Sequence, residues 1–294
     1  MLYLLARNYA REGFTMASIS KTDLINAAIK FSNESPMNYL DKDNAMLPNL
    51  VGMRIFEEPL LVVGDVSDPI FESLQAPESV GPQFMLPDAW LPGARSVISF
   101  FLPFTEQVIE ANKLEPIEVP PEWLHARVEG QAMLEALAAS LQVMLVDAGY
   151  PSVIPSNDPR FALNRTPEVV ERDGVTWKTF TSNWSERHVA YACGLGTFGI
   201  SKGLITKRGK AGRFGSIVTT LPLEPDVRPY SRYDEYCTYC GVCVPRCPVH
   251  AINLQEGKDK KTCWIVQQES RIKYAPRYGC GKCYVDVPCA RQIP

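Results

Sequence analysis

Nine cysteines occur among the 294 residues, and eight of them lie between Cys237 and Cys289. The run Cys237-Thr-Tyr-Cys240-Gly-Val-Cys243-Val-Pro-Arg-Cys247-Pro has the C-x2-C-x2-C-x3-C-P spacing of bacterial ferredoxins. Three cysteines at such short intervals can present three thiolates to one cubane, and the fourth ligates a second cluster. A structural zinc site normally uses separated C-x2-C pairs, so this spacing favours iron–sulfur chemistry over zinc.

The remaining cysteines of this region form a less regular second group, which runs from Cys263 through Cys280 and Cys283 to Cys289. Each cubane needs four thiolates, and in two-cluster ferredoxins the last cysteine of one motif ligates the other cluster. This crossover rule predicts two 4Fe–4S clusters with interleaved ligands. The first set is Cys237, Cys240, Cys243 and Cys289, and the second is Cys247, Cys263, Cys280 and Cys283. The chain is therefore expected to transfer electrons.

Charge and composition argue against nucleic-acid binding, membrane insertion and secretion. Residues 230–294 hold ten Lys or Arg against six Asp or Glu, whereas the whole chain carries a net charge of −3. Thiolate-bound cubanes would offset this local excess, and a nucleic-acid surface is the alternative. The basic residues are scattered among the cysteines, so nucleic acid is not expected as a partner. No apolar run reaches the ~20 residues of a membrane span, and no secretory leader is recognisable, so we expect a cytoplasmic protein.

The apolar pattern predicts the elements that position these cysteines. Residues 60–65 and 96–102 are short continuous apolar runs typical of buried strands. A helical stripe over 121–148 begins at a proline and ends at a glycine. Further elements are a helix near 20–31, a Pro-rich irregular loop over 76–93, a strand over 177–182, a helix over 185–193, and strands over 204–206 and 214–220. Residues 221–233 look like a linker.

The segment after the 185–193 helix contains glycines that can bring backbone amides close to a ligand. Gly194, Gly196 and Gly199, with Ser201 and Ser216, are the candidate cofactor-binding residues, and a tight helix-to-strand connection is the alternative. In the helix itself, Glu186 and His188 are the available acid/base groups. The alternative for Glu186 is an interaction with the helix dipole in the first turn.

Three other residues have simpler interpretations. Cys193 stands outside the cysteine sets, and a small buried residue is favoured over a redox thiol. His125 and His250 are expected at the surface or at the edge of the core.

Taken together, these segments resemble the epoxyqueuosine reductase family, whose relatives include the reductive dehalogenases. The resemblance rests on GARSVISFFLPF, SERHVAYACGLGTFGISKGLIT, GRFGSIVTT and the cysteine pattern with its isolated Cys263. It implies an α+β fold: a nitroreductase-like α/β domain over 16–228, followed by a small ferredoxin-like two-cluster domain over 229–294. Residues 1–15 are expected to be a non-native or disordered extension. Phe180 stands where the family carries an aspartate proton donor.

The resemblance also implies a function. Electrons from a donor such as ferredoxin or flavodoxin would pass through the two clusters to a reductive site in the first domain, with cobalamin as a candidate cofactor. The alternative is a non-catalytic electron-transfer protein or a reductive activator of a partner enzyme, and the residue at position 180 favours it. The acceptor, a small molecule or a protein, is not specified by these patterns.

Overall fold

The computed structural model describes residues 19–294, so the extension expected over residues 1–15 lies outside the described residues. Its centre is a four-stranded sheet in the order β1 (Leu60–Asp65), β2 (Ser96–Pro103), β10 (Gly212–Thr219) and β3 (Ser152–Val153). Every neighbouring pair is antiparallel. All eight residues of β2 are buried, because both faces of this strand are covered.

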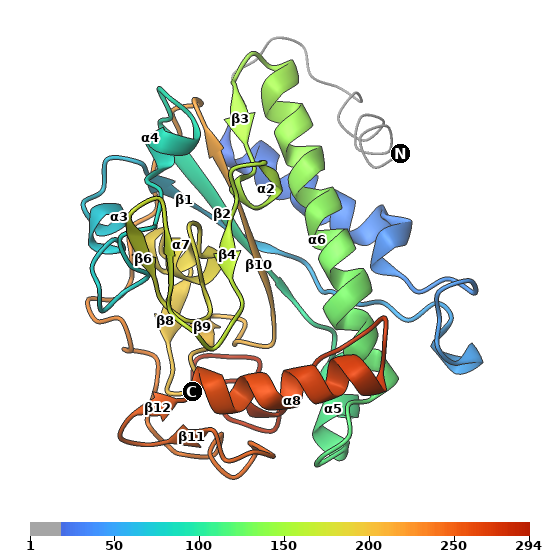
Figure 1. Cartoon of the computed structure of the whole chain (residues 1–294). Helices are drawn as coiled ribbons and strands as arrows, with labels where there is room; N and C mark the ends of the chain where they lie inside the picture. Colours follow the sequence, from blue (N-terminus) through green and yellow to red (C-terminus); the bar gives the residue numbers. More distant parts are fainter. Residues whose placement is uncertain (1–18) are drawn as a thin grey trace.

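Two helices cover opposite faces of the sheet (Figure 1). Alternate side chains of a strand point to opposite faces. Ile98 and Phe100 of β2 accordingly share a core with the long helix α6 (Pro121–Asp147), whereas Val97 packs with residues of the short helix α7 (Glu186–Ala192). The helix α2 (Lys21–Glu34) also packs on α6, and it begins with a capping box between Ser20 and Asp23.

The remaining elements of the larger part are short. They are the helices α3 (Ile70–Ser73), α4 (Pro87–Trp90) and α5 (Glu106–Leu114), the 3-10 turns η1 (Pro36–Asn38), η2 (Pro48–Leu50) and η3 (Pro155–Asn157), and three small antiparallel pairs. These pairs are β4 (Leu163–Asn164) with β7 (Thr181–Ser182), β5 (Val170–Arg172) with β6 (Val175–Trp177), and β8 (Gly196–Phe198) with β9 (Leu204–Thr206).

The cysteine region, residues 237–289, lies at the lower end of the sheet (Figure 1). It contains β11 (Ile252–Asn253), β12 (Gly257–Lys258), the helix α8 (Lys260–Lys273) and the 3-10 turn η4 (Lys282–Tyr284). The backbone amide of Lys210 donates to the carbonyl oxygen of Cys289 at 3.1 Å. The backbone amide of Ala211 donates to the carbonyl oxygen of Ala290, also at 3.1 Å. Val285 is fully buried in the same core as α6. The last cysteines are therefore fixed to the chain just before β10.

Most predicted elements are confirmed, and three differ. The strand expected over 177–182 is interrupted, because Phe180 has a φ of 52° and breaks the extended chain between β6 and β7. The loop expected over 76–93 contains the short helix α4, and the helix α8 was not predicted. Within the described residues, no helix is both long enough and apolar enough to cross a membrane.

Candidate functional site

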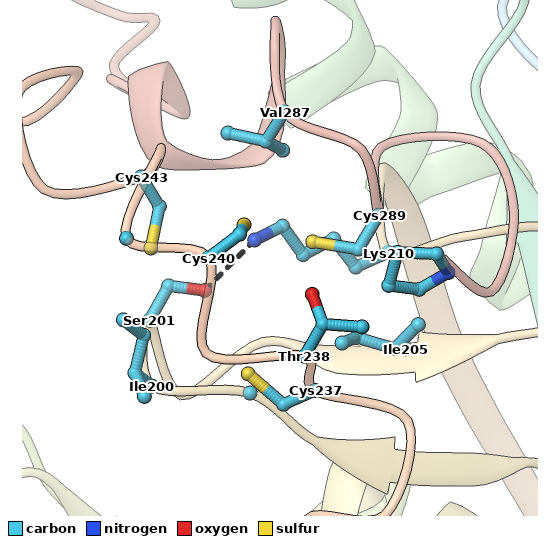
Figure 2. A pocket seen from close by; sticks show the side chains of 13 residues that line it. Ile200, Ser201, Ile205, Lys210, Cys237, Thr238, Cys240, Cys243, Val287 and Cys289 are labelled. Carbon is cyan, nitrogen blue, oxygen red and sulfur yellow. Dashed lines mark hydrogen bonds between the residues drawn. The ribbon is translucent and has the colours of Figure 1, made fainter. Parts of the chain in front are cut away.

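Four cysteines line one small cavity at the junction of the cysteine region and the β8–β9 pair (Figure 2). Cys237, Cys240 and Cys243 come from a loop without regular structure, and Cys289 comes from the segment that is hydrogen-bonded to Lys210. This is the first set that the crossover rule predicts. Short spacing brings the first three together, and backbone pairing with the chain before β10 brings the fourth.

A buried lysine lies against these sulfurs. Lys210 is 1% exposed, and its Nζ donates to Oγ of Ser201 at 3.0 Å (Figure 2). Burial alone would lower the pKa of Lys210, but the neighbouring Cys289, Cys283 and Cys243 thiolates outweigh burial and raise the pKa. A cation held in this position stabilises negative charge on thiolates and on a cluster bound to them.

The second set lies around another lysine. The amide of Ala251 donates to Sγ of Cys247 at 3.2 Å, and Nζ of Lys258 lies 3.7 Å from Sγ of Cys283. Burial raises the pKa of Cys280 to about 11, with contributions from Cys283 and Cys263. Burial likewise raises the pKa of Cys263, and the charges of Cys283 and Cys247 add to this effect. These four thiols therefore lie within electrostatic reach of one another.

The donor chemistry of both sets fits iron–sulfur clusters. Each set offers four thiols beside a lysine, the buried Lys210 in the first set and the partly buried Lys258 in the second. Burial without a metal disfavours thiolate, and it raises the pKa of Cys243 to about 11. Iron binding supplies the charge that compensates buried thiolates. Within residues 19–294, no three His, Cys, Asp or Glu side chains are placed to hold a single metal ion.

The glycine segment borders the first cysteine set. Gly199 and Ser201 line the cavity, and a Cβ at Gly199 would lie 3.6 Å from Sγ of Cys237. A Cβ at Gly196 would lie 2.0 Å from the carbonyl oxygen of Ile205, so this glycine allows β8 to approach β9. Gly194 has a φ of 99° and lies beside Arg228. This geometry fits a cavity wall and a tight connection.

Ser216 lies apart from that segment, in contact with Glu186. Its Oγ donates to Oε2 of Glu186 at 2.7 Å and accepts from Nε1 of Trp184 at 2.9 Å. Oε1 of Glu186 is buried and has no hydrogen-bond partner. Burial raises the pKa of Glu186 to about 8, and the Ser216 hydrogen bond opposes this shift only in part. Glu186 is thus a protonated carboxylic acid at neutral pH, which can donate a proton.

His188 lies two residues further along the same short helix. Its Nδ1 is 2.7 Å from Oγ of Ser185, and its ring packs on Phe198 with 4.7 Å between centroids. Burial, together with the charges of Arg187 and Lys260, lowers the pKa of His188 to about 3. The imidazole is therefore neutral at physiological pH.

Other residues singled out in the sequence have structural surroundings. Cys193 is fully buried in the core beneath α7, where burial raises its pKa strongly, as expected for an unreactive thiol. The prediction for His125 is wrong, because this residue is completely buried. Its Nε2 accepts from the amide of Met46 at 3.0 Å, and its Nδ1 lies 3.1 Å from the Glu129 carboxylate. His250 is exposed.

Sequence reasoning missed Lys210 and Lys258. Lys210 ends the run Lys-Arg-Gly-Lys, which is typical of an exposed turn, and Lys258 lies in a charged stretch before α8. Neither stretch carries an apolar pattern that would indicate burial. Their positions follow only from the packing of these segments against the cysteines.

Comparisons with known proteins agree with this description. Residues 231–253 match the family model of a 4Fe-4S binding domain. No curated protein matches the sequence. Among solved structures, a reductive dehalogenase studied for B12-dependent dehalogenation is similar with a TM-score of 0.52 and 13% identity, over 99% of this chain and 37% of that one.

The structural neighbours also include epoxyqueuosine reductases. The Bacillus subtilis structure gives a TM-score of 0.44 and 18% identity over 81% of this chain and 62% of that chain. The Streptococcus thermophilus structure gives 0.43 and 17% over 79% and 62%. The chain thus spans between about a third and two thirds of these neighbours. The matched motif indicates a 4Fe-4S binding region over residues 231–253, and the similarity to the dehalogenase is one of fold.

Proposed function

We propose that this protein is an iron–sulfur reductase that holds two 4Fe–4S clusters and delivers electrons to a site in its larger, N-terminal part. One observation carries the proposal: Cys237, Cys240, Cys243 and Cys289, which are distant in sequence, line a single cavity beside the buried Lys210. The second set, grouped around Lys258, would hold the other cluster. The clusters would supply single electrons at low potential.

Glu186 and His188 are the residues proposed to act at the reductive site. Reduction of most organic groups consumes protons as well as electrons, and Glu186 carries its proton at neutral pH. Its neighbour Arg187 donates through Nη1 to the hydroxyl of Tyr284 at 3.1 Å, and Tyr284 follows Cys283 directly. The Arg187–Tyr284 hydrogen bond thus joins α7 to the segment that carries Cys280 and Cys283.

Cobalamin is the organic cofactor that the dehalogenase-like fold suggests. The glycine segment lines the cysteine cavity and packs on β9, so we assign no residue of that segment to a corrinoid and derive no step through it. Incubation of the purified protein with cobalamin would test the suggestion, and a base-off visible spectrum is the expected positive result.

The second candidate is an electron-transfer protein or reductive activator without a reaction of its own. It is favoured by Phe180, which replaces the family aspartate, has a φ of 52° and packs near Trp264 with 6.3 Å between ring centroids. Failure to bind either cobalamin or flavin, together with electron transfer to a partner protein, would support this candidate. A ferredoxin or flavodoxin remains the proposed donor in both cases.

The central proposal is tested by anaerobic reconstitution followed by iron and sulfide analysis. About eight irons and eight sulfides per chain are expected. A colourless protein, or one that contains only a zinc ion after oxygen-free purification, would contradict it. Reduction by a low-potential donor, followed by electron paramagnetic resonance, should then show two interacting reduced clusters.

A further inference from the structure

Three arginines from three different elements gather around one tyrosine where the cysteine region meets the sheet. Arg127 lies on α6, Arg213 on β10 and Arg271 on α8, and these elements meet at the lower end of the sheet (Figure 1). Nη2 of Arg127 donates to the hydroxyl of Tyr278 at 3.1 Å. Cζ of Arg271 lies 3.8 Å from the centre of the Tyr278 ring, and Cζ of Arg127 lies 4.8 Å from it. We call Arg127, Arg213 and Arg271 the arginine cluster.

The charges of the arginine cluster act on one another at close range. Burial lowers the pKa of Arg213 to about 9, and the charge of Arg127 adds to this shift. Burial also lowers the pKa of Arg127, and here the charge of Arg271 contributes. Gathering cations in a poorly solvated place costs free energy unless a counter-charge is present. The cluster is therefore unfavourable on its own.

The described residues supply little counter-charge, because the Glu135 carboxylate acts on Arg213 without forming an ion pair with it. None of the ion pairs between residues 19 and 294 includes a member of the arginine cluster. The nearest acid that acts on Arg213 is Glu135, which accepts from Gln131 at 2.9 Å. Gln131 in turn accepts from Arg213. Arg213 thus has a neutral amide as its partner.

Two donors of the arginine cluster remain unused. Nε of Arg213 and Nε of Arg271 are both buried and have no hydrogen-bond partner. Unsatisfied buried donors are rare in folded proteins and need an explanation. A guanidinium group presents its N–H groups in a planar fork that matches a carboxylate or a phosphate. An oxyanion would use both donors and neutralise the charge.

We propose that the arginine cluster binds an oxyanion, a carboxylate or phosphate group of a small-molecule ligand. Tyr278 lies two residues before Cys280. A ligand held by the cluster would therefore lie beside the second cysteine set. The proposal goes beyond the reductase function and does not require the clusters or any organic cofactor, since it rests on the arginines alone.

Thermal unfolding of the anaerobically purified, cluster-loaded protein tests this site, with inorganic phosphate and succinate as probes at constant ionic strength. A ligand that binds only the folded state raises the melting temperature. We expect a saturable rise with at least one probe, and the probe that acts distinguishes phosphate from carboxylate recognition. Arg213→Met and Arg271→Met should each weaken the apparent affinity by about tenfold or more, because a charged hydrogen bond is lost.

The same variants show whether the arginines bind an anion or only stabilise the fold. Without added anion, Arg213→Met should melt at or above the temperature of the unaltered protein, because an uncompensated cation has been removed. Arg172→Met is the matched control, since Arg172 is exposed and stacks on Trp177 at 4.9 Å. It should keep the full response. If Arg213→Met does not fold, Arg271→Met decides alone.

Two results overturn the proposal. One is an anion response that follows ionic strength or is absent with both probes. The other is an Arg271→Met protein that binds the probe as tightly as the unaltered chain. Iron analysis of each sample distinguishes a failure of the anion-site proposal from a failure of the reductase proposal. Missing clusters appear as missing iron, and a protein without clusters can still be titrated with phosphate.

Discussion

Oγ of Ser216, in the middle of the central sheet, donates to Oε2 of Glu186 at 2.7 Å and leaves Oε1 of the same carboxyl group buried without a partner. A single neutral donor is weak compensation for a buried carboxylate. The acid therefore keeps its proton to a pH of about 8. Helix α7 thus presents a neutral carboxylic acid to the central sheet.

The protonated state of Glu186 should be directly visible. We expect an infrared carbonyl band of a protonated carboxyl group that persists above pH 7 and disappears in Glu186→Gln. Ser216→Ala should shift its titration to a higher pH, because the Ser216 hydrogen bond favours the charged form. Ser99→Ala is the control: Ser99 pairs with Ser216 in the sheet, but its buried hydroxyl has no partner. An unchanged spectrum in Glu186→Gln would refute the assignment.

The same group should make stability depend on pH. The folded-state pKa of Glu186, about 8, is above the ordinary value of 4.5. Between these values the unfolded chain has released the proton while the folded chain retains it, so the stability due to this group falls as pH rises. It is complete below about 4.5 and lost once the pH has passed about 8. Chemical unfolding from pH 5 to 8 should therefore show a shallower decline for Glu186→Gln than for the unaltered protein.

Lys210 should tune the cluster held by the first cysteine set. Its ammonium group is buried beside Cys289 and Cys243, and a reduced cluster carries one more negative charge than an oxidised one. Lys210→Met should therefore make the reduction potential more negative, by tens of millivolts. Potentiometric titration followed by electron paramagnetic resonance measures this shift. Lys207→Met, an exposed change in the same turn, should leave the potential unaltered.

An element of this structure could be predicted where neighbouring residues in the sequence carry a clear apolar pattern. The strand over residues 60–65 was predicted from a continuous apolar run, and the helix over 121–148 from apolar residues that follow the helical period. The apolar residues of helix α8 do not indicate how it packs, because Ile265 is 50% exposed and Ile272 is 85% exposed. Its buried residue is Ser270, so its apolar pattern does not mark the face that packs.

In the candidate site, too, the residues that lie close together in sequence could be predicted. Cys237, Cys240 and Cys243 meet through short spacing, which a sequence displays directly. Lys210 and the arginine cluster consist of charged residues that look like surface residues in isolation. The burial of Lys210 and the partial burial of the arginines result from contacts between segments as distant as Arg127 and Tyr278, and no local pattern records such contacts. Phe180 is similar, because its left-handed conformation interrupts a stretch whose composition favours a strand.

Two glycines of one segment should respond differently to the same change. A Cβ at Gly196 would lie 2.0 Å from the carbonyl oxygen of Ile205, so Gly196→Ala must push β8 away from β9. We expect a loss of stability of about 1–3 kcal/mol and a lower iron content, since the neighbouring loop lines the cysteine cavity. Gly199→Ala is the matched control for stability only, because the nearest contact of its Cβ is a flexible Ile205 methyl group at 3.3 Å, whereas Sγ of Cys237 lies 3.6 Å away. Equal effects of the two changes on stability would contradict this account.

The interleaved pairing of cysteines makes the sharpest prediction, because Cys289 is 46 residues from Cys243 in sequence yet lines the same cavity. Cys289→Ala should reduce the iron content from about eight to about four per chain, and Cys240→Ala should remove the same cluster. Cys263→Ala should remove the other one, so that the double variant Cys289→Ala/Cys263→Ala is nearly iron-free. Cys193→Ala should keep all the iron, since that thiol is buried in the core beneath α7. If Cys289→Ala and Cys240→Ala instead lost different clusters, as Mössbauer or paramagnetic resonance spectra would reveal, the crossover would be wrong and each cysteine motif would hold its own cluster.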